Sequence, residues 1–393
     1  MTIDRTALRR AVLAAVLLHV IPAAAHAQVR PALIFRGAPE ASWIAPPRLP
    51  AESLVVFHAR RTFDLASKPA RFVVHVSADS RYRLYVNGEQ VSSGPQRSDV
   101  MHWRYETVDL APRLRAGGNT IAAVVWSWGA RHPVAQHGHR PAFLLQGDGP
   151  SEAVANTGAG WKLYRDSAYA EVRVTPQDVR SAYYAATQGE SVDGARYPWG
   201  WERADFADAG WLTVPGVAPR DAAPSGPSPV IGPIHLHAVP GKGGYGDASG
   251  WQLEPRDIPP MEERPIRFAA VRNAVGIASM DGFIKGAGDL VVPANARASL
   301  VLDHARTTNA YAVVETSGGA ASTLTLTYAE AAIDSAGHKG NRNEVAGRTI
   351  IGIHDRFRLD GGDHRRYQTL YWRSGRYVKL DIETGAEPLR IHD

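Results

Sequence analysis

The stretch SADSRYRLYVNGEQVSSGPQRSD, residues 77–99, constrains the fold of this chain more than any other segment. Tyr82, Leu84 and Val86 alternate with polar residues, which is the period of a β-strand with one buried face. Asn87-Gly88 follows directly, and this dipeptide readily takes the positive φ angles of a two-residue hairpin turn. Strands joined by such tight turns predict antiparallel sheets.

Strand signals recur along the chain, while helical signals are scarce. Residues 119–129 are apolar on both faces and bounded by glycines, as in a strand buried between two layers, whereas residues 323–329 and 376–385 alternate. Residues 175–190 hold the main helical signal, a threonine followed by proline, and predict one or two turns. The chain is therefore predicted to be all-β, with two antiparallel jelly-roll-like β-sandwiches in series.

The composition changes in the middle of the 393-residue chain. Residues 215–250 are rich in proline and glycine, and we place the domain boundary there. The prediction is an N-terminal sandwich over 28–240, a linker over 241–250 and a second sandwich over 251–393. The linker contains GKGGYG, which matches the spacing G-x-G-x-x-G, but no helix begins within it, so it does not predict a dinucleotide site.

The first 27 residues have the features of a secretory signal peptide. Three arginines precede the apolar run AVLAAVLLHVI, and the small residues of Ala25-His26-Ala27 follow it. The run is well short of the ~20 residues that a helix needs to span a bilayer. We expect an exported protein, in the periplasm or outside the cell, with no membrane span.

Composition excludes several classes of function. The chain has no cysteine, so disulfides, thiolate metal sites and cysteine nucleophiles are absent. Its formal net charge of +5 is spread along the sequence without a block of lysine or arginine, which argues against nucleic acid as a partner.

Aromatic and charged residues offer candidate carbohydrate contacts. Trp126 and Trp128 are two apart in a predicted strand, so both face one side, where they either stack on a sugar or belong to the core. Trp103 lies with Arg97 and Asp99 in a predicted loop and is the better exposed candidate. The two charged side chains either bind sugar hydroxyls or form a salt bridge that holds the loop.

No metal ligand or cofactor is assigned from the sequence, although acids on sandwich loops are compatible with structural calcium. His132, His137 and His139 are close enough in sequence to converge on zinc, but the alternative is a polar loop beside a sheet edge.

A glycosidase needs two carboxyl groups that face each other across the scissile bond. The second half of the chain supplies candidates, but the sequence brings no two of them together: Glu330, Asp334, Glu344, Asp360 and Asp363. No catalytic residue is therefore assigned.

Several segments in order carry a family resemblance that covers most of residues 50–393. Residues 77–99 and the segments HWRYETVDLAPRLRAGGNTIAAVVW and WERADFADAGW resemble the N-terminal β-sandwich of bacterial α-L-rhamnosidases, glycoside hydrolase family 78. The segments LTYAEAAIDSAGHKGNRNEV and DRFRLDGGDHRRYQTLYWRSGRYVKLDIETGAEPLRI are similar to the second sandwich of these enzymes. In the family an α/α barrel follows and carries the acids for inverting hydrolysis.

The resemblance implies a truncated, non-catalytic ancillary portion of an exported enzyme that acts on rhamnose-containing glycans. The catalytic α/α barrel is then expected in cis or in trans, on a partner chain. The alternative is a stand-alone secreted carbohydrate-binding module.

Overall fold

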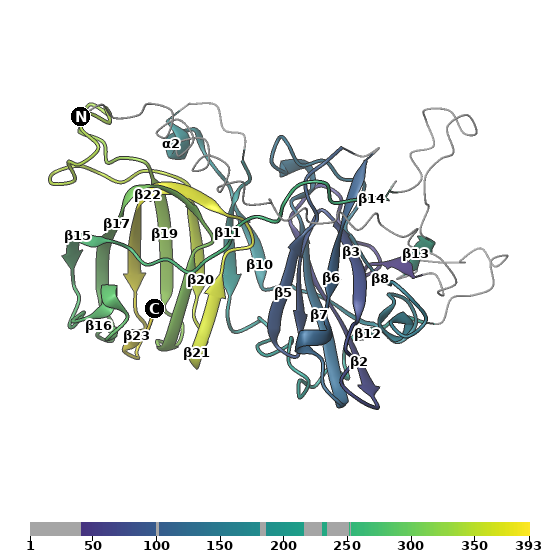
Figure 1. Cartoon of the computed structure of the whole chain (residues 1–393). Coiled ribbons are helices and arrows are strands. Elements are labelled where there is room, and N and C mark those ends of the chain that lie inside the picture. Colours follow the sequence, from purple (N-terminus) through teal and green to yellow (C-terminus); the bar gives the residue numbers. More distant parts are fainter. Residues whose placement is uncertain (1–40, 100–101, 181–185, 216–229, 234–250, 252) are drawn as a thin grey trace, which may run out of the picture.

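The computed structural model describes residues 41–99, 102–180, 186–215, 230–233, 251 and 253–393. Two β-sandwiches lie side by side in Figure 1, so the predicted all-β fold is confirmed. The predicted signal peptide, 1–27, and the predicted linker, 241–250, lie outside the described residues. Among the residues that are described, no helix has the length and apolar character needed to cross a bilayer.

The first sandwich consists of two six-stranded sheets. One has the order β13 (Val230–Pro233), β1 (Ser42–Ile44), β8 (Ala142–Gly147), β3 (Val73–Asp79), β6 (Trp103–Asp109) and β14 (Leu253–Pro255). The other has the order β12 (Leu212–Thr213), β9 (Lys162–Arg165), β2 (Val55–Leu65), β7 (Gly117–Ser127), β4 (Arg81–Val86) and β5 (Glu89–Gly94).

Alternating residues of these strands form the core of the first sandwich. Tyr82, Leu84 and Val86 of β4 are fully buried there, on the face that the sequence pattern predicted. Asn87 and Gly88 have φ angles of 51° and 89°, so the turn between β4 and β5 has the positive φ values expected of this dipeptide. The stretch that opened the sequence analysis is thus a hairpin that supports one face of the sandwich.

The second sandwich packs a seven-stranded sheet on a four-stranded one. The larger sheet has the order β10 (Tyr169–Val172), β11 (Gly189–Asp193), β20 (His354–Arg358), β19 (Thr323–Ala329), β22 (Arg373–Glu383), β17 (Arg297–Ala310) and β15 (Ala270–Val275). The smaller has the order β16 (Leu290–Val292), β23 (Leu389–Ile391), β18 (Val313–Gly318) and β21 (Gly361–Gln368).

Helical structure is short, as expected. The segment predicted to hold one or two turns forms α2 (Pro176–Val179), which Thr175 and Asp178 cap reciprocally. The remaining helical elements that the structure describes are 3₁₀ turns: η1 (Ala111–Arg113), η2 (Gly129–Arg131), η3 (Ala153–Ala155) and η4 (Phe283–Lys285).

The two sandwiches exchange strands across the middle of the sequence. β10 and β11 precede the proline- and glycine-rich segment, yet β11 pairs in parallel with β20 of the second sandwich (Figure 1). β14 follows that segment, yet it pairs in parallel with β6 of the first sandwich. The ranges 28–240 and 251–393 therefore do not coincide with the two sets of strands, because linker composition marks a connection and carries no information on strand pairing.

The sandwiches meet at a buried interface that contains charged side chains. The Arg83 guanidinium of β4 donates a hydrogen bond of 2.5 Å to the Thr369 carbonyl of the second sandwich and lies over the Trp126 ring. Beside this contact, the backbone N–H of Leu370 donates to the Glu190 carboxylate at 2.8 Å. Arg373 binds Asp355 through two hydrogen bonds of 2.5 and 2.8 Å in the same buried region.

Burial raises the pKa of Glu190 from its ordinary value of 4.5 to about 8, and the nearby Asp355 charge adds to the rise. The folded protein therefore holds this proton at pH values where the unfolded chain has released it. Because the folded state binds more protons between pH 4.5 and 8, this contribution to stability is complete below pH 4.5 and is lost as the pH rises through about 8.

We predict that Glu190→Gln flattens this pH dependence. The amide stays neutral at every pH and keeps an acceptor for the Leu370 N–H, so stability near pH 5 should resemble wild type and should fall less by pH 8. Urea unfolding followed by tryptophan fluorescence at pH 5, 6.5 and 8 measures the difference. Equal slopes for the two proteins would contradict the assigned protonation.

Candidate functional site

A cleft of about 410 Å³ lies at one end of the first sandwich. Its walls come from the segment after β1, the junction of β3 and β4, and the loop that connects β7 to β8. The lining residues that carry polar side chains are Arg48, Asp79, Ser80, Ser127, His132, Gln136, His139 and Arg140. The volume falls within the range of small-molecule sites.

Asp79, the last residue of β3, is the buried anchor of this cleft. Its carboxylate accepts hydrogen bonds from the backbone N–H groups of His139 and Arg140, at 2.5 and 3.1 Å. The Trp251 indole donates to the same oxygen at 3.0 Å. Burial raises the pKa of Asp79, and these three hydrogen bonds oppose the rise.

Gly138 explains how the loop approaches Asp79 so closely. A Cβ at this position would collide with the Asp79 carboxylate, so only glycine leaves room for the two neighbouring backbone donors. Asp79 therefore fixes the loop between β7 and β8 against the end of β3.

Gln136 is the polar group of the cleft whose hydrogen bonding is incomplete. Its side chain is buried, and neither the amide nitrogen nor the amide oxygen has a hydrogen-bond partner among the described residues. A buried polar group without a partner costs about 1–3 kcal/mol. The amide has two donors and an acceptor, and since both of its polar atoms are buried, a ligand in the cleft would reach them only after the side chain turns outward.

A smaller hollow adjoins the cleft and shares Ser80 and Gln136 with it. Arg97 and Trp103, two of the residues predicted from sequence, both line this hollow. Arg97 is exposed and forms no ion pair within the described part of the chain. Asp99 contacts His102 at 3.0 Å. The predicted alternative, a salt bridge between Arg97 and Asp99, is therefore not formed.

The expectation that Trp103 is an exposed loop residue is wrong. Trp103 begins β6 and is only 4% exposed, within a cluster that includes Trp43 and Trp251. The cause is β14, which pairs Leu253 with Trp103 and covers it. This pairing joins segments that are far apart in sequence, so local composition gave no sign of it.

Trp126 and Trp128 lie in the core, which was the second interpretation of their spacing. Both are at most 2% exposed and pack with Trp201 of the first half and Leu370 of the second sandwich. Neither lines the cleft. Their role is to bury the interface between the two sandwiches.

The histidines of the loop between β7 and β8 contact different neighbouring residues. His139 packs against the rings of Trp103 and Trp251, at centroid distances of 6.2 and 5.8 Å. His132 contacts the Pro133 carbonyl at 2.8 Å and lies 6.3 Å from the ring of His137. The structure thus places these residues along the loop and cleft without bringing them to one point.

The acids that the sequence offered for hydrolysis have separate local partners. Glu330 pairs with Lys339 at 3.0 Å, and Glu344 pairs with Arg348 at 2.6 Å. The other contacts are Asp334 to the His338 N–H, Asp360 to Arg365, and Asp363 to the Ser317 hydroxyl. Among the described residues, Asp79 is the one carboxylate that lines the cleft, so no facing acid pair is found there.

Sequence reasoning did not select Asp79 or Gln136. Gln136 lies in the loop RHPVAQHGHR, where only the histidines were considered as candidate ligands. No local signal identifies Asp79, because its donors come from His139, Arg140 and Trp251, which are far from it in sequence.

Comparisons with known proteins show similarity in both sequence and fold. Residues 67–229 match the α-L-rhamnosidase N-terminal domain family. An α-L-rhamnosidase from Streptomyces avermitilis is 28% identical over 213 residues, which are 50% of this chain and 19% of that enzyme.

Two solved structures show the same fold. The GH78 family rhamnosidase of Bacillus sp. GL1 has a TM-score of 0.68 at 15% identity, over 90% of this chain and 54% of that one. The α-L-rhamnosidase of Dictyoglumus thermophilum has a TM-score of 0.51 at 16% identity, over 89% and 35% of the two chains. The chain thus spans about half or less of the length of these relatives.

The two β-sandwiches of this chain thus share the fold of a part of each of these two rhamnosidases. Residues 67–229 are similar to the α-L-rhamnosidase N-terminal domain, and together the comparisons support the interpretation of the chain as an N-terminal region of a rhamnosidase.

We predict that Asp79→Ala releases the loop between β7 and β8. Two backbone donors and the buried Trp251 indole lose their acceptor, which should lower the free energy of unfolding by at least about 2 kcal/mol. Limited trypsin digestion should also cleave faster after Arg131, in the same loop. Asp64→Ala, at an exposed acid on the same sandwich, is the matched control and should stay within about 0.5 kcal/mol of wild type. Equal stability and equal cleavage of the two variants would show that Asp79 does not hold the loop.

Proposed function

We propose that this chain is the ancillary, non-catalytic β-sandwich portion of an exported α-L-rhamnosidase-like glycoside hydrolase. The two sandwiches support a catalytic α/α barrel, in cis or in trans, and the cleft of the first sandwich contacts rhamnose-containing glycans. The observation that carries the proposal is that Asp79 is the one carboxylate lining the cleft among the described residues, and that it is buried and already bound by three donors. Glycoside hydrolysis needs a second carboxyl group opposite the first.

The lining of the cleft is suited to a neutral sugar. Sugar hydroxyls would satisfy the unpaired amide of Gln136 and reach the hydroxyl groups of Ser80 and Ser127. Part of the lining is apolar and comes from the segment after β1: Ala45, Pro46, Pro47, Leu49 and Pro50. Rhamnose is a 6-deoxy sugar, and its methyl group would pack against this apolar part while its hydroxyls face the polar residues.

The second candidate is a stand-alone secreted carbohydrate-binding module. The observation that favours it is the same unpaired Gln136 amide, because it indicates binding that needs no barrel. The two proposals differ in whether the chain works together with a catalytic barrel.

We predict that the purified chain does not hydrolyse an aryl α-L-rhamnoside above the uncatalysed rate. The reason is the lack of a facing carboxyl pair around the cleft in the described residues. The release of the aryl group, followed by absorbance, measures turnover. Robust cleavage that Glu330→Gln or Glu344→Gln abolishes would contradict the proposal.

We predict that L-rhamnose or a rhamnose-terminated oligosaccharide binds the isolated chain and that Gln136→Ala weakens binding about tenfold, the loss of roughly one hydrogen bond to a sugar hydroxyl. Isothermal titration calorimetry measures the affinity. Gln90→Ala, at an exposed glutamine of β5, is the control and should bind as wild type. No binding across a panel of rhamnose-containing glycans would count against the module and against the glycan contact of the cleft.

A further inference from the structure

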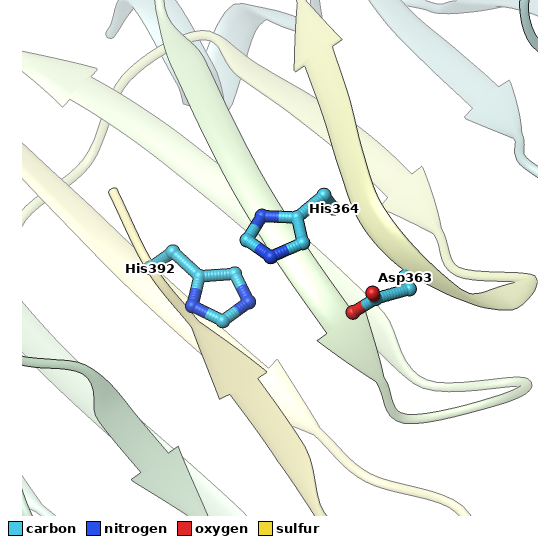
Figure 2. A group of neighbouring side chains, drawn as sticks. All are labelled: Asp363, His364 and His392. Carbon is cyan, nitrogen blue, oxygen red and sulfur yellow. The ribbon is translucent and has the colours of Figure 1, made fainter.

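A second group of side chains lies on the smaller sheet of the second sandwich, far from the cleft in sequence. Asp363 and His364 belong to β21, and His392 directly follows β23; these two strands flank β18. Figure 2 shows the carboxylate and both imidazole rings turned toward a common space. One ligand atom from each of the three residues lies within 4.8 Å of the others.

The backbone places these side chains together. β18 and β21 shift register between Thr316 and Gly318, and His364 adopts a φ of 48° within the shifted part of β21. A bulge of this kind redirects a side chain, and a positive φ at a residue other than glycine costs energy. His392 is held by a hydrogen bond of 2.8 Å from its N–H to the Glu315 carbonyl, next to the bulge.

A carboxylate holds the outer nitrogen of each ring. His364 Nδ1 contacts Glu315 at 2.5 Å, and His392 Nδ1 contacts Asp289 at 3.0 Å. Asp289 is fixed in turn by Arg390 at 2.7 Å. A carboxylate on Nδ1 orients the ring and keeps a proton on that nitrogen, so Nε2 is the atom that binds a metal once it is deprotonated; this is the usual outer support of metal-binding histidines.

We propose that Asp363, His364 and His392 bind a divalent transition-metal ion of the Zn²⁺ type through one carboxylate oxygen and the two Nε2 atoms. Two imidazoles and one carboxylate form a donor set that zinc accepts, whereas calcium prefers oxygen ligands alone. This site does not rest on the glycan function proposed above.

The three ligand atoms have to move closer to one another to bind an ion, and the exposure of two of the side chains allows this movement. Zinc binds nitrogen and oxygen at about 2.0–2.2 Å, so donors within 4.8 Å must shift inward. Asp363 and His364 are exposed, so no packing around their side chains opposes a small inward shift. The Ser317 hydroxyl donates to Asp363 at 2.6 Å and, having only one proton, accepts from His392 Nε2 at 2.7 Å. The ion would replace these two hydrogen bonds, and the Nε2 proton would be released to solvent.

The test is calorimetric titration of the purified chain with ZnCl₂ and, separately, with CaCl₂. We expect saturable Zn²⁺ binding that is at least tenfold weaker in His364→Ala and in His392→Ala, with little heat from Ca²⁺. Glu315→Gln should weaken binding about tenfold, as the loss of an outer carboxylate typically does. Circular dichroism without metal verifies that each variant is folded.

Two controls keep the assignment falsifiable. His338→Ala removes an exposed histidine of the same sandwich and should leave the affinity unchanged. Ser317→Ala keeps all three ligands, so its affinity should equal or exceed that of wild type. Equal Zn²⁺ affinity for His364→Ala and His338→Ala would overturn the site, and a tenfold loss in Ser317→Ala would overturn the assigned ligand set. A rise in Tm on addition of Zn²⁺ for wild type, absent in His392→Ala, gives a second readout.

Discussion

The interlocked interface between the two sandwiches determines how the rest of the molecule is held. β11 adds to the second sandwich beside β20, and the loop after β21 then brings Leu370 against Trp126 and Trp128. Apolar burial supplies the main favourable free energy there, while Arg83 and Glu190 satisfy backbone groups that would otherwise lose water without a partner. The buried carboxyl remains compatible with this environment because it keeps its proton.

The cleft, like the interface, depends on hydrogen bonds that satisfy buried polar groups. Asp79 is bound by backbone donors on one side and by Trp251 on the other, so a residue beyond the proline- and glycine-rich segment helps to shape a site in the first sandwich. Gln136, in contrast, lies in the same loop with its amide unpaired. The contrast separates a residue that builds the site from one that is available to a ligand.

Local sequence patterns predicted the strands and their buried faces well, because alternation and turn residues act over a few positions. The hairpin at Asn87-Gly88 and the buried Tyr82 and Leu84 are examples. Contacts between distant segments could not be predicted in this way. The burial of Trp103 by β14, the donors around Asp79 and the meeting of His364 with His392 all depend on pairings that no short pattern encodes.

The exchange of β11 and β14 also affects the order in which the chain can fold. Glu190 and Asp355 are 165 residues apart, so the strand that carries the first must wait, on a ribosome, for synthesis of the strand that carries the second. Until then, the unpaired N–H and C=O groups along the edge of β11 can pair with a wrong strand. Neither sandwich can be excised by cutting a single bond, so nascent chains of intermediate length are the species most exposed to wrong pairing.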